Sequence, residues 1–165
     1  MKTLVLASIL MVAACSKKTD DNAAVVGAGA SEGAVELAEA ANAACKVLAR
    51  ADAEAWVGHA LDQYKGRPKP VGFDCTYSSK QLFSSVAVLL YTSNGADHMQ
   101  KQKNAKLFGE APVAIPGVGT EAVRSPDNTV VGVVVGDKLA YVMAVTDKPT
   151  AEASERLAKS IASHM

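Results

Sequence analysis

Residues 129–145 read TVVGVVVGDKLAYVMAV and decide the fold class. Two runs of β-type residues, 129–135 and 138–145, are separated only by the dipeptide Gly136-Asp137. A two-residue connection between such runs is typical of a tight hairpin, because glycine tolerates the positive φ that these turns require. The stretch therefore predicts two neighbouring antiparallel strands.

Three further stretches favour strands. Residues 121–125 precede the hairpin and are connected to it by Pro126-Asp127-Asn128, three residue types that are common in turns. Upstream, 73–77 alternate apolar and polar residues, and 84–92 (SSVAVLLYT) form an almost continuous β-type run. We therefore predict about five strands, and we expect the KGRPKP segment at 65–70 to break regular structure.

Four stretches predict helices. Residues 32–49 place apolar side chains at helical spacing after Ser31, a suitable N-cap. A short helix is expected from an Asp52 cap to Leu61, and two more over 97–108 and 150–163. This order predicts an α+β fold, with N-terminal, central and C-terminal helices packed on an antiparallel sheet.

Composition limits the class of protein. The chain has 165 residues, of which 17 are basic, 17 acidic and 49% hydrophobic. That length fits a single domain, which we place at 31–165. The balanced charge gives no overall field that would attract nucleic acid, so we expect no nucleic-acid partner.

The N-terminus has the features of an export signal. Met1-Lys2 is followed by an apolar run over 3–14, then by Cys15. A basic start, a short apolar run and small residues before a cleavage site are typical of a secretory signal peptide. Twelve helical residues are too short for a hydrocarbon layer of about 30 Å.

The end of this run, Val12-Ala13-Ala14-Cys15, resembles the lipobox of bacterial lipoproteins. The resemblance implies cleavage after Ala14, diacylglycerol on the Cys15 sulfur and, usually, acylation of the new amino group. Residues 1–14 would then be the signal peptide and 15–30 a flexible tether, rich in alanine and glycine. An ordinary secretory peptide or an uncleaved anchor is the alternative.

The resemblance implies a location as well. The chain would be exported and held in the bacterial cell envelope by acyl chains, whose buried methylene groups bind the membrane. Ser16 directly after the cysteine resembles the outer-membrane pattern of Gram-negative lipoproteins. In such a bacterium the domain would face the periplasm.

Two cysteines remain once Cys15 is assigned to lipid. Cys45 lies on the apolar face of the first expected helix, and Cys75 shares a strand face with Phe73 and Tyr77. Because thiols of exported proteins are usually oxidised, we predict a structural disulfide between them. Free buried thiols and a redox or metal site are the alternatives, although no C-x-x-C motif is present.

The cysteines also belong to a second resemblance. The segments 45–48 (CKVL), 53–58 (AEAWVG), 75–77 (CTY) and 115–122 (IPGVGTEA) resemble a group of small actinobacterial lipoproteins of unknown function. That resemblance implies a helix joined to a strand by a disulfide, and it implies no catalytic residue.

No motif for catalysis stands out. The three histidines, His59, His98 and His164, are far apart in sequence, and we expect them to be exposed or capping residues. No serine lies in a G-x-S-x-G elbow. We therefore predict no catalytic residue, no metal and no cofactor.

One segment has an excess of positive charge. Between 65 and 106 the chain has seven basic residues and two acidic ones, Asp74 and Asp97. Such a cluster favours an anionic partner, for example an envelope polymer or lipid headgroups, if it lies on one side of the domain. A solvated charged face is the alternative. The seven residues are Lys65, Arg67, Lys69, Lys80, Lys101, Lys103 and Lys106.

Taken together, these patterns predict a membrane-anchored binding or interaction module without catalytic activity. Two alternatives remain at this point. One is an envelope hydrolase or redox enzyme whose site is assembled from residues distant in sequence. The other is a sensor or inhibitor domain that acts on a partner protein.

Overall fold

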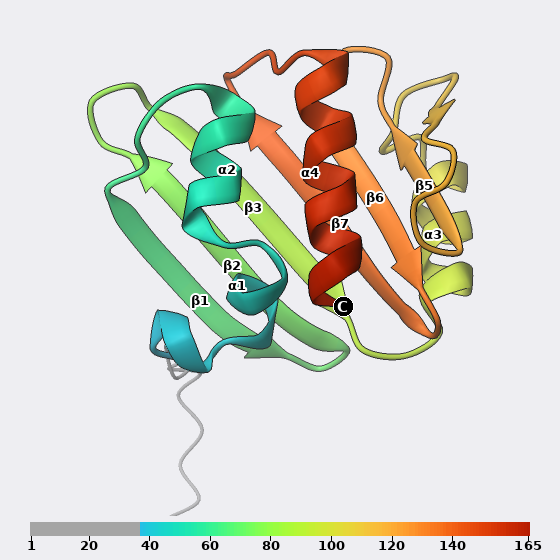
Figure 1. Ribbon diagram of the computed structural model, residues 1–165. Coiled ribbons are helices and arrows are strands. Elements are labelled where there is room, and N and C mark those ends of the chain that lie inside the picture. Colours follow the sequence, from blue (N-terminus) through green and yellow to red (C-terminus); the bar gives the residue numbers. More distant parts are fainter. Residues whose placement is uncertain (1–36) are drawn as a thin grey trace, which may run out of the picture. The chain divides into compact units, whose positions relative to one another are not determined.

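The computed structural model describes residues 37–165. They form an α+β fold, as the sequence predicts, with a single antiparallel sheet and helices on both of its faces (Figure 1). The expected signal peptide and the whole of the expected tether, including Cys15, lie outside the described residues.

The sheet has seven strands instead of the predicted five or so, in the order β1-β2-β3-β7-β6-β5-β4. The hairpin predicted at 129–145 is β6 and β7, in which Val135 pairs with Lys138 across the Gly136-Asp137 turn. The strands are β1 (Gln63–Lys69), β2 (Gly72–Ser79), β3 (Ser84–Tyr91), β4 (Val113–Ala114), β5 (Glu121–Arg124), β6 (Val130–Val135) and β7 (Lys138–Val145).

The expectation that 65–70 breaks regular structure is wrong, because β1 runs through Pro68. The carbonyl of Gly66 accepts a hydrogen bond from Leu37 N–H, so it points away from β2. Pro68 lies two residues further along the strand, and its missing N–H would point to the same outer side. At the edge of a sheet this proline removes no ladder hydrogen bond.

The helices match the predictions only loosely. The continuous helix expected over 32–49 is interrupted within its described part, where Asn42 caps a new helix by accepting a hydrogen bond from Ala44 N–H. Asp52 lies in the first turn of the second helix, not at its cap. The helical elements are η1 (Glu39–Ala41), α1 (Ala43–Val47), α2 (Arg50–Val57), α3 (Gly95–Asn104) and α4 (Ala151–His164).

Three of these helices cover one face of the sheet. Figure 1 shows α1, α2 and α4 in front of the strands, and α3 behind them beside β5 and β6. The main core lies between the sheet and the three front helices and includes Trp56, Tyr77 and Leu157. A smaller core lies under α3 and includes Met99, Phe108 and Leu139.

The predicted disulfide is present between Cys45 of α1 and Cys75 of β2. Their Cα atoms are 5.4 Å apart, and both side chains are buried in the main core. The bridge therefore fixes α1 to the sheet. None of the helices within 37–165 has the length and apolar character needed to cross a membrane.

Candidate functional site

Half of one sheet face is uncovered within the described residues. On this face α3 packs on β6 and β7, whereas β1, β2 and β3 have no helix over them (Figure 1). We name this region the open half-face. It is formed by Lys65, Arg67 and Lys69 of β1, Asp74 and Thr76 of β2, Ala87 and Leu89 of β3, and Tyr141 and Met143 of β7.

The pairing register brings these side chains together. One row across the sheet consists of Lys65, Thr76, Ala87 and Met143, each paired with the next. Because side chains alternate along a strand, residues between these rows point to the other face. Cys75 is such a residue, and it lies in the main core.

The floor of the open half-face is a shallow apolar groove of about 300 Å³. Leu89 is partly buried there, whereas Met143 is 38% exposed although it lies in a strand. An exposed apolar floor framed by polar groups is typical of an interaction surface. The groove is lined by Lys69, Asp74, Thr76, Ala87, Val88, Leu89, Tyr141 and Met143.

Helix α3 forms one wall of this region through its contacts with β3. The imidazole of His98 stacks on the ring of Tyr91, with ring centroids 4.0 Å apart. One turn later, Gln102 Nε2 donates a hydrogen bond to the Tyr91 hydroxyl at 3.0 Å. Burial raises the pKa of the neighbouring Tyr141, so its hydroxyl stays neutral.

Strand β1 forms the opposite, basic border. The carboxylate beside it, that of Asp74, accepts a hydrogen bond from the backbone N–H of Arg67 at 2.8 Å and forms an ion pair with Lys69 Nζ at 2.9 Å. Arg67 Nε is buried, lies 4.0 Å from the same carboxylate and donates no hydrogen bond within the described residues. Three cations face one carboxylate, so this border is positively charged.

The fold divides the seven basic residues predicted as one cluster. Lys101 and Lys103 lie on α3 and Lys106 just after it, on the same side of the sheet as the β1 residues. Strands are spaced by about 4.8 Å, so β7, on which α3 packs, is about 14 Å from β1. Lys80 lies in the turn between β2 and β3.

Acidic residues from outside the cluster pair with two of its three lysines in and just after α3. Lys103 pairs with Glu121 of β5, and Lys106 Nζ lies 2.7 Å from Glu110 Oε1. Lys65 makes no ion pair within residues 37–165. Lys80 and Lys101 likewise make no ion pair within these residues, so unpaired positive charge remains on β1, on α3 and in the turn between β2 and β3.

The structure also assembles a polar cluster that the sequence did not predict. His59 Nε2 lies 3.0 Å from one carboxylate oxygen of Asp147, and Ser84 Oγ donates a hydrogen bond to the other. In a serine hydrolase the histidine stands between serine and acid, because it must remove the serine proton. Here the acid stands in the middle and Ser84 is 2% exposed, so the cluster lacks an activated, accessible nucleophile.

This cluster favours a charged histidine. His59 Nδ1 lies 3.1 Å from the carbonyl oxygen of Ala60. The hydrogen bond to that carbonyl raises the pKa of His59, burial opposes the rise, and the hydrogen bond to Asp147 adds to it. The role indicated is structural, since the three residues join the loop after α2 to β3 and to the loop after β7.

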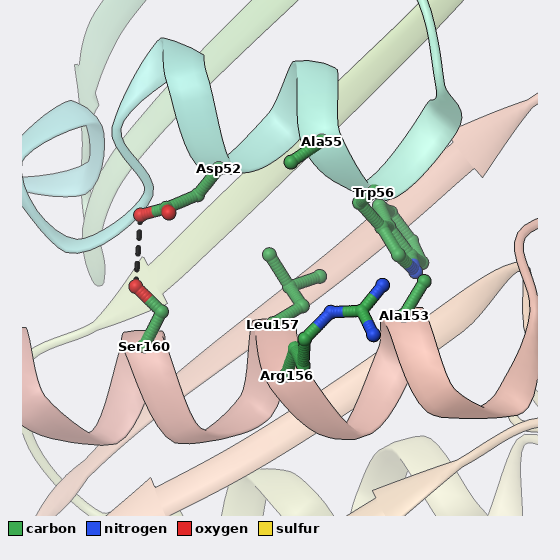
Figure 2. Close-up of a pocket in the computed structure, with 7 residues that line it drawn as sticks. All are labelled: Asp52, Ala55, Trp56, Ala153, Arg156, Leu157 and Ser160. Atoms are coloured by element: carbon green, nitrogen blue, oxygen red, sulfur yellow. Dashed lines mark hydrogen bonds between the residues drawn. The ribbon is translucent and has the colours of Figure 1, made fainter.

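A second depression lies between α2 and α4 (Figure 2). At about 160 Å³ it is smaller than the usual range of ligand pockets, which begins at about 300 Å³. Its polar groups are paired: Ser160 Oγ donates to Asp52 at 2.8 Å, as Figure 2 shows, and Arg156 binds Glu152 at 2.6 Å. This depression is therefore part of the contact between the two helices.

No group of three or more His, Cys, Asp or Glu side chains suited to a metal ion occurs in the described part of the chain. Comparison of the sequence and the structure with protein-family models, with curated proteins and with solved structures gave no match. Geometry is therefore the basis for the functional argument, and the open half-face is the strongest candidate site.

Proposed function

We propose that this chain is a lipid-anchored protein of the bacterial cell envelope, and that its α+β domain is a non-catalytic binding module for an anionic partner. The anchor is supported by the segment Val12-Ala13-Ala14-Cys15 and the apolar run before it. The Cys45–Cys75 disulfide supports export, because such bridges persist in oxidising compartments.

The open half-face is the observation that carries the binding function. An apolar floor that includes Met143, 38% exposed, costs free energy in water unless a partner covers it. The basic border on β1 selects a partner of negative charge. Of the seven basic residues predicted as a cluster, we assign the binding role to Lys65, Arg67 and Lys69, because they border the apolar groove.

The enzyme alternative has weaker support. The polar cluster of Ser84, Asp147 and His59 is the closest approach to a catalytic arrangement that we find among residues 37–165, and its order is unsuitable for general-base catalysis. The groove on the open half-face contains a single carboxylate, which is bound to Lys69. A binding module needs neither an activated nucleophile nor a general base.

The anchor is tested by the mass of the protein extracted from bacterial membranes. We expect a chain that begins at Cys15 and carries diacylglycerol, with or without a further acyl group. An unmodified N-terminus at Cys15 or at any later residue would contradict the anchor.

The binding function is tested by charge reversal on β1. We expect the triple variant Lys65→Glu, Arg67→Glu, Lys69→Glu to retain at least about tenfold less solubilised envelope material than the unaltered protein, at equal stability. The matched control reverses two exposed lysines elsewhere, Lys148→Glu and Lys159→Glu, and should change nothing. Equal retention by the triple variant would contradict the proposal.

A further inference from the structure

We infer that the open half-face is the docking site for an amphipathic helix with an acidic flank, supplied by a partner protein. This inference rests on the proposed binding function and names the chemistry of the partner. Helix recognition of this kind places an apolar helix face in a groove and uses charges at its border for orientation.

The open half-face has room for one helix. Among the described residues, the front of the sheet carries two columns of helices, α1 with α2 in one and α4 in the other, whereas the back carries α3 alone (Figure 1). The distance from β1 to β7, the strand on which α3 packs, is about 14 Å, and a helix with its side chains is about 10–12 Å across. A docked helix beside α3 would complete the second layer.

The length of the open half-face also suits a helix. Strand β3 has eight residues, which span about 26 Å at 3.3 Å per residue. A helix of about 16 residues spans about 24 Å. Its apolar stripe would cover Ala87, Leu89 and Met143, the apolar floor residues whose side chains are not fully buried.

The basic border fits a helical pattern of acids. Lys65, Arg67 and Lys69 alternate along β1 and project to the same face, so the outer two are about 13 Å apart. Carboxylates at positions i, i+4 and i+8 of a helix span about 12 Å on one flank. Because Asp74 already binds Lys69, the unbalanced charge lies at Lys65 and Arg67.

An added β-strand fits this border less well. The carbonyl of Gly66 already accepts a hydrogen bond from Leu37 N–H. Pro68 has no N–H to offer on the outer side of β1. Edge strands with such features resist pairing with further strands.

A membrane surface fits less well than a helix because the face is not flat. Helix α3 stands on the same side of the sheet, packed on β6 and β7. A layer of helix packed on a sheet rises by about 10 Å, so a planar bilayer that touches α3 would not reach Leu89. A helix can lie in the step beside α3.

The test is selection from a displayed library of random peptides about 16 residues long, with the full chain as bait. We expect enriched sequences to share apolar residues at i, i+3, i+4 and i+7, with Asp or Glu four residues apart on one flank. The selected peptides should bind at least about tenfold more weakly to Met143→Asp and to the triple β1 variant. Binding to the Lys148→Glu, Lys159→Glu control should be unchanged.

Several results would overturn the inference. They are no enrichment, enrichment of extended or basic sequences, and binding that is insensitive to Met143→Asp in a variant that unfolds like the unaltered protein. Binding of the unacylated full chain, Cys15→Ser, to phosphatidylglycerol vesicles that is lost in the β1 variant would assign the surface to lipid instead. The mass of the extracted protein and the retention of envelope material are measured separately, so the proposed function can stand when this inference fails.

Discussion

His59 is the residue whose protonation bears most directly on stability. Its pKa is raised in the fold, so the protonated form is favoured by folding. The stabilisation is complete below the unfolded value of about 6.5 and is lost as the pH rises through the folded value. The cluster with Asp147 therefore contributes to stability mainly on the acidic side of neutrality.

The first prediction follows from the direction of this pKa shift. The free energy of unfolding, measured by urea titration, should fall as the pH rises above the unfolded pKa of about 6.5, and His59→Gln should flatten this part of the profile. His164→Gln is the control, because His164 is exposed and its ring makes no hydrogen bond within residues 37–165. A profile of unchanged slope in His59→Gln would show that another group is responsible.

The side chain of Asn42 connects α1 to the sheet. It is fully buried, its Oδ1 accepts a hydrogen bond from Ala44 N–H at 2.9 Å, and its Nδ2 donates to the Asp74 carbonyl at 2.7 Å. One side chain thus caps α1 and attaches it to β2. Sequence patterns do not predict this role, because an asparagine within an apolar helical pattern is compatible with a continuous helix.

The second prediction concerns this side chain. Asn42→Ala should lower the free energy of unfolding by about 1–3 kcal/mol, because it removes a cap and leaves buried polar groups without partners. Asn104→Ala, at the exposed end of α3, is the matched control and should cost much less. Equal losses in the two variants would refute this account of α1.

At the scale of elements, the attachment of α1 to the sheet depends on the Cys45–Cys75 bridge. The sequence separation of its cysteines is 30 residues. A cross-link over a loop of that size restricts the unfolded chain by about 3–4 kcal/mol in the chain-entropy model. Helix α1 has only five residues and would not be stable alone.

The third prediction is the cost of removing the bridge. The double variant Cys45→Ala, Cys75→Ala should lose about 3 kcal/mol of unfolding free energy in urea titration. Cys15→Ser should leave the unfolding curve of the purified protein unchanged. If the double variant unfolds at the same urea concentration as the unaltered protein, the bridge does not stabilise the fold as described.

The position of α3 depends on a glycine in the sheet. A Cβ atom on Gly132 would lie 2.6 Å from Phe108 Cζ and 2.9 Å from Met99 Cε, both closer than van der Waals contact. Because Gly132 has no side chain, Phe108 and Met99 can pack directly on β6, and this contact positions α3. The same packing closes one half of the face and leaves the other open.

The fourth prediction uses this contact. Gly132→Ala should cost about 1–3 kcal/mol through overpacking, and Phe108→Leu in the same chain should recover part of that cost. The measurement is a double-mutant cycle of unfolding free energies. Strict additivity of the two changes would contradict the predicted contact.

Sequence patterns predicted the elements whose local signals agree with their packing. The β6–β7 hairpin and α4 are found within a residue or two of the predicted bounds, because turn chemistry and apolar spacing determine them locally. Strand β1 was missed because proline and glycine are read as breakers, and their tolerance depends on an edge position. That position is a property of the whole sheet.

At the scale of the whole molecule, the candidate site could be predicted only in part. The charge excess between 65 and 106 was visible in the sequence, but its neutralisation by Glu110 and Glu121 depends on ion pairs made in the fold. Likewise His59 and Asp147 are 88 positions apart and meet only through loop packing. Periodic patterns in a short stretch of sequence cannot predict contacts between residues so far apart in the chain.

The two faces of the sheet differ in the surface that they offer to a partner. One face of the sheet is closed by three helices, while the other combines an apolar floor with a basic border. The proposed lipid anchor on Cys15 would hold this domain near the membrane, and a flexible tether over 15–30 would limit its reach to a few tens of ångströms. We therefore expect one partner surface, not several.

The central claim is that the open half-face is the surface that binds a partner, and photo-crosslinking in intact bacteria tests it most directly. A photoreactive amino acid is placed at Met143 on the open half-face or at Lys159 on α4, both of which are exposed. We predict a covalent adduct from position 143 that disappears in the Lys65→Glu, Arg67→Glu, Lys69→Glu background, and none from position 159. Adducts from position 159 alone, or none from position 143, would contradict the claim.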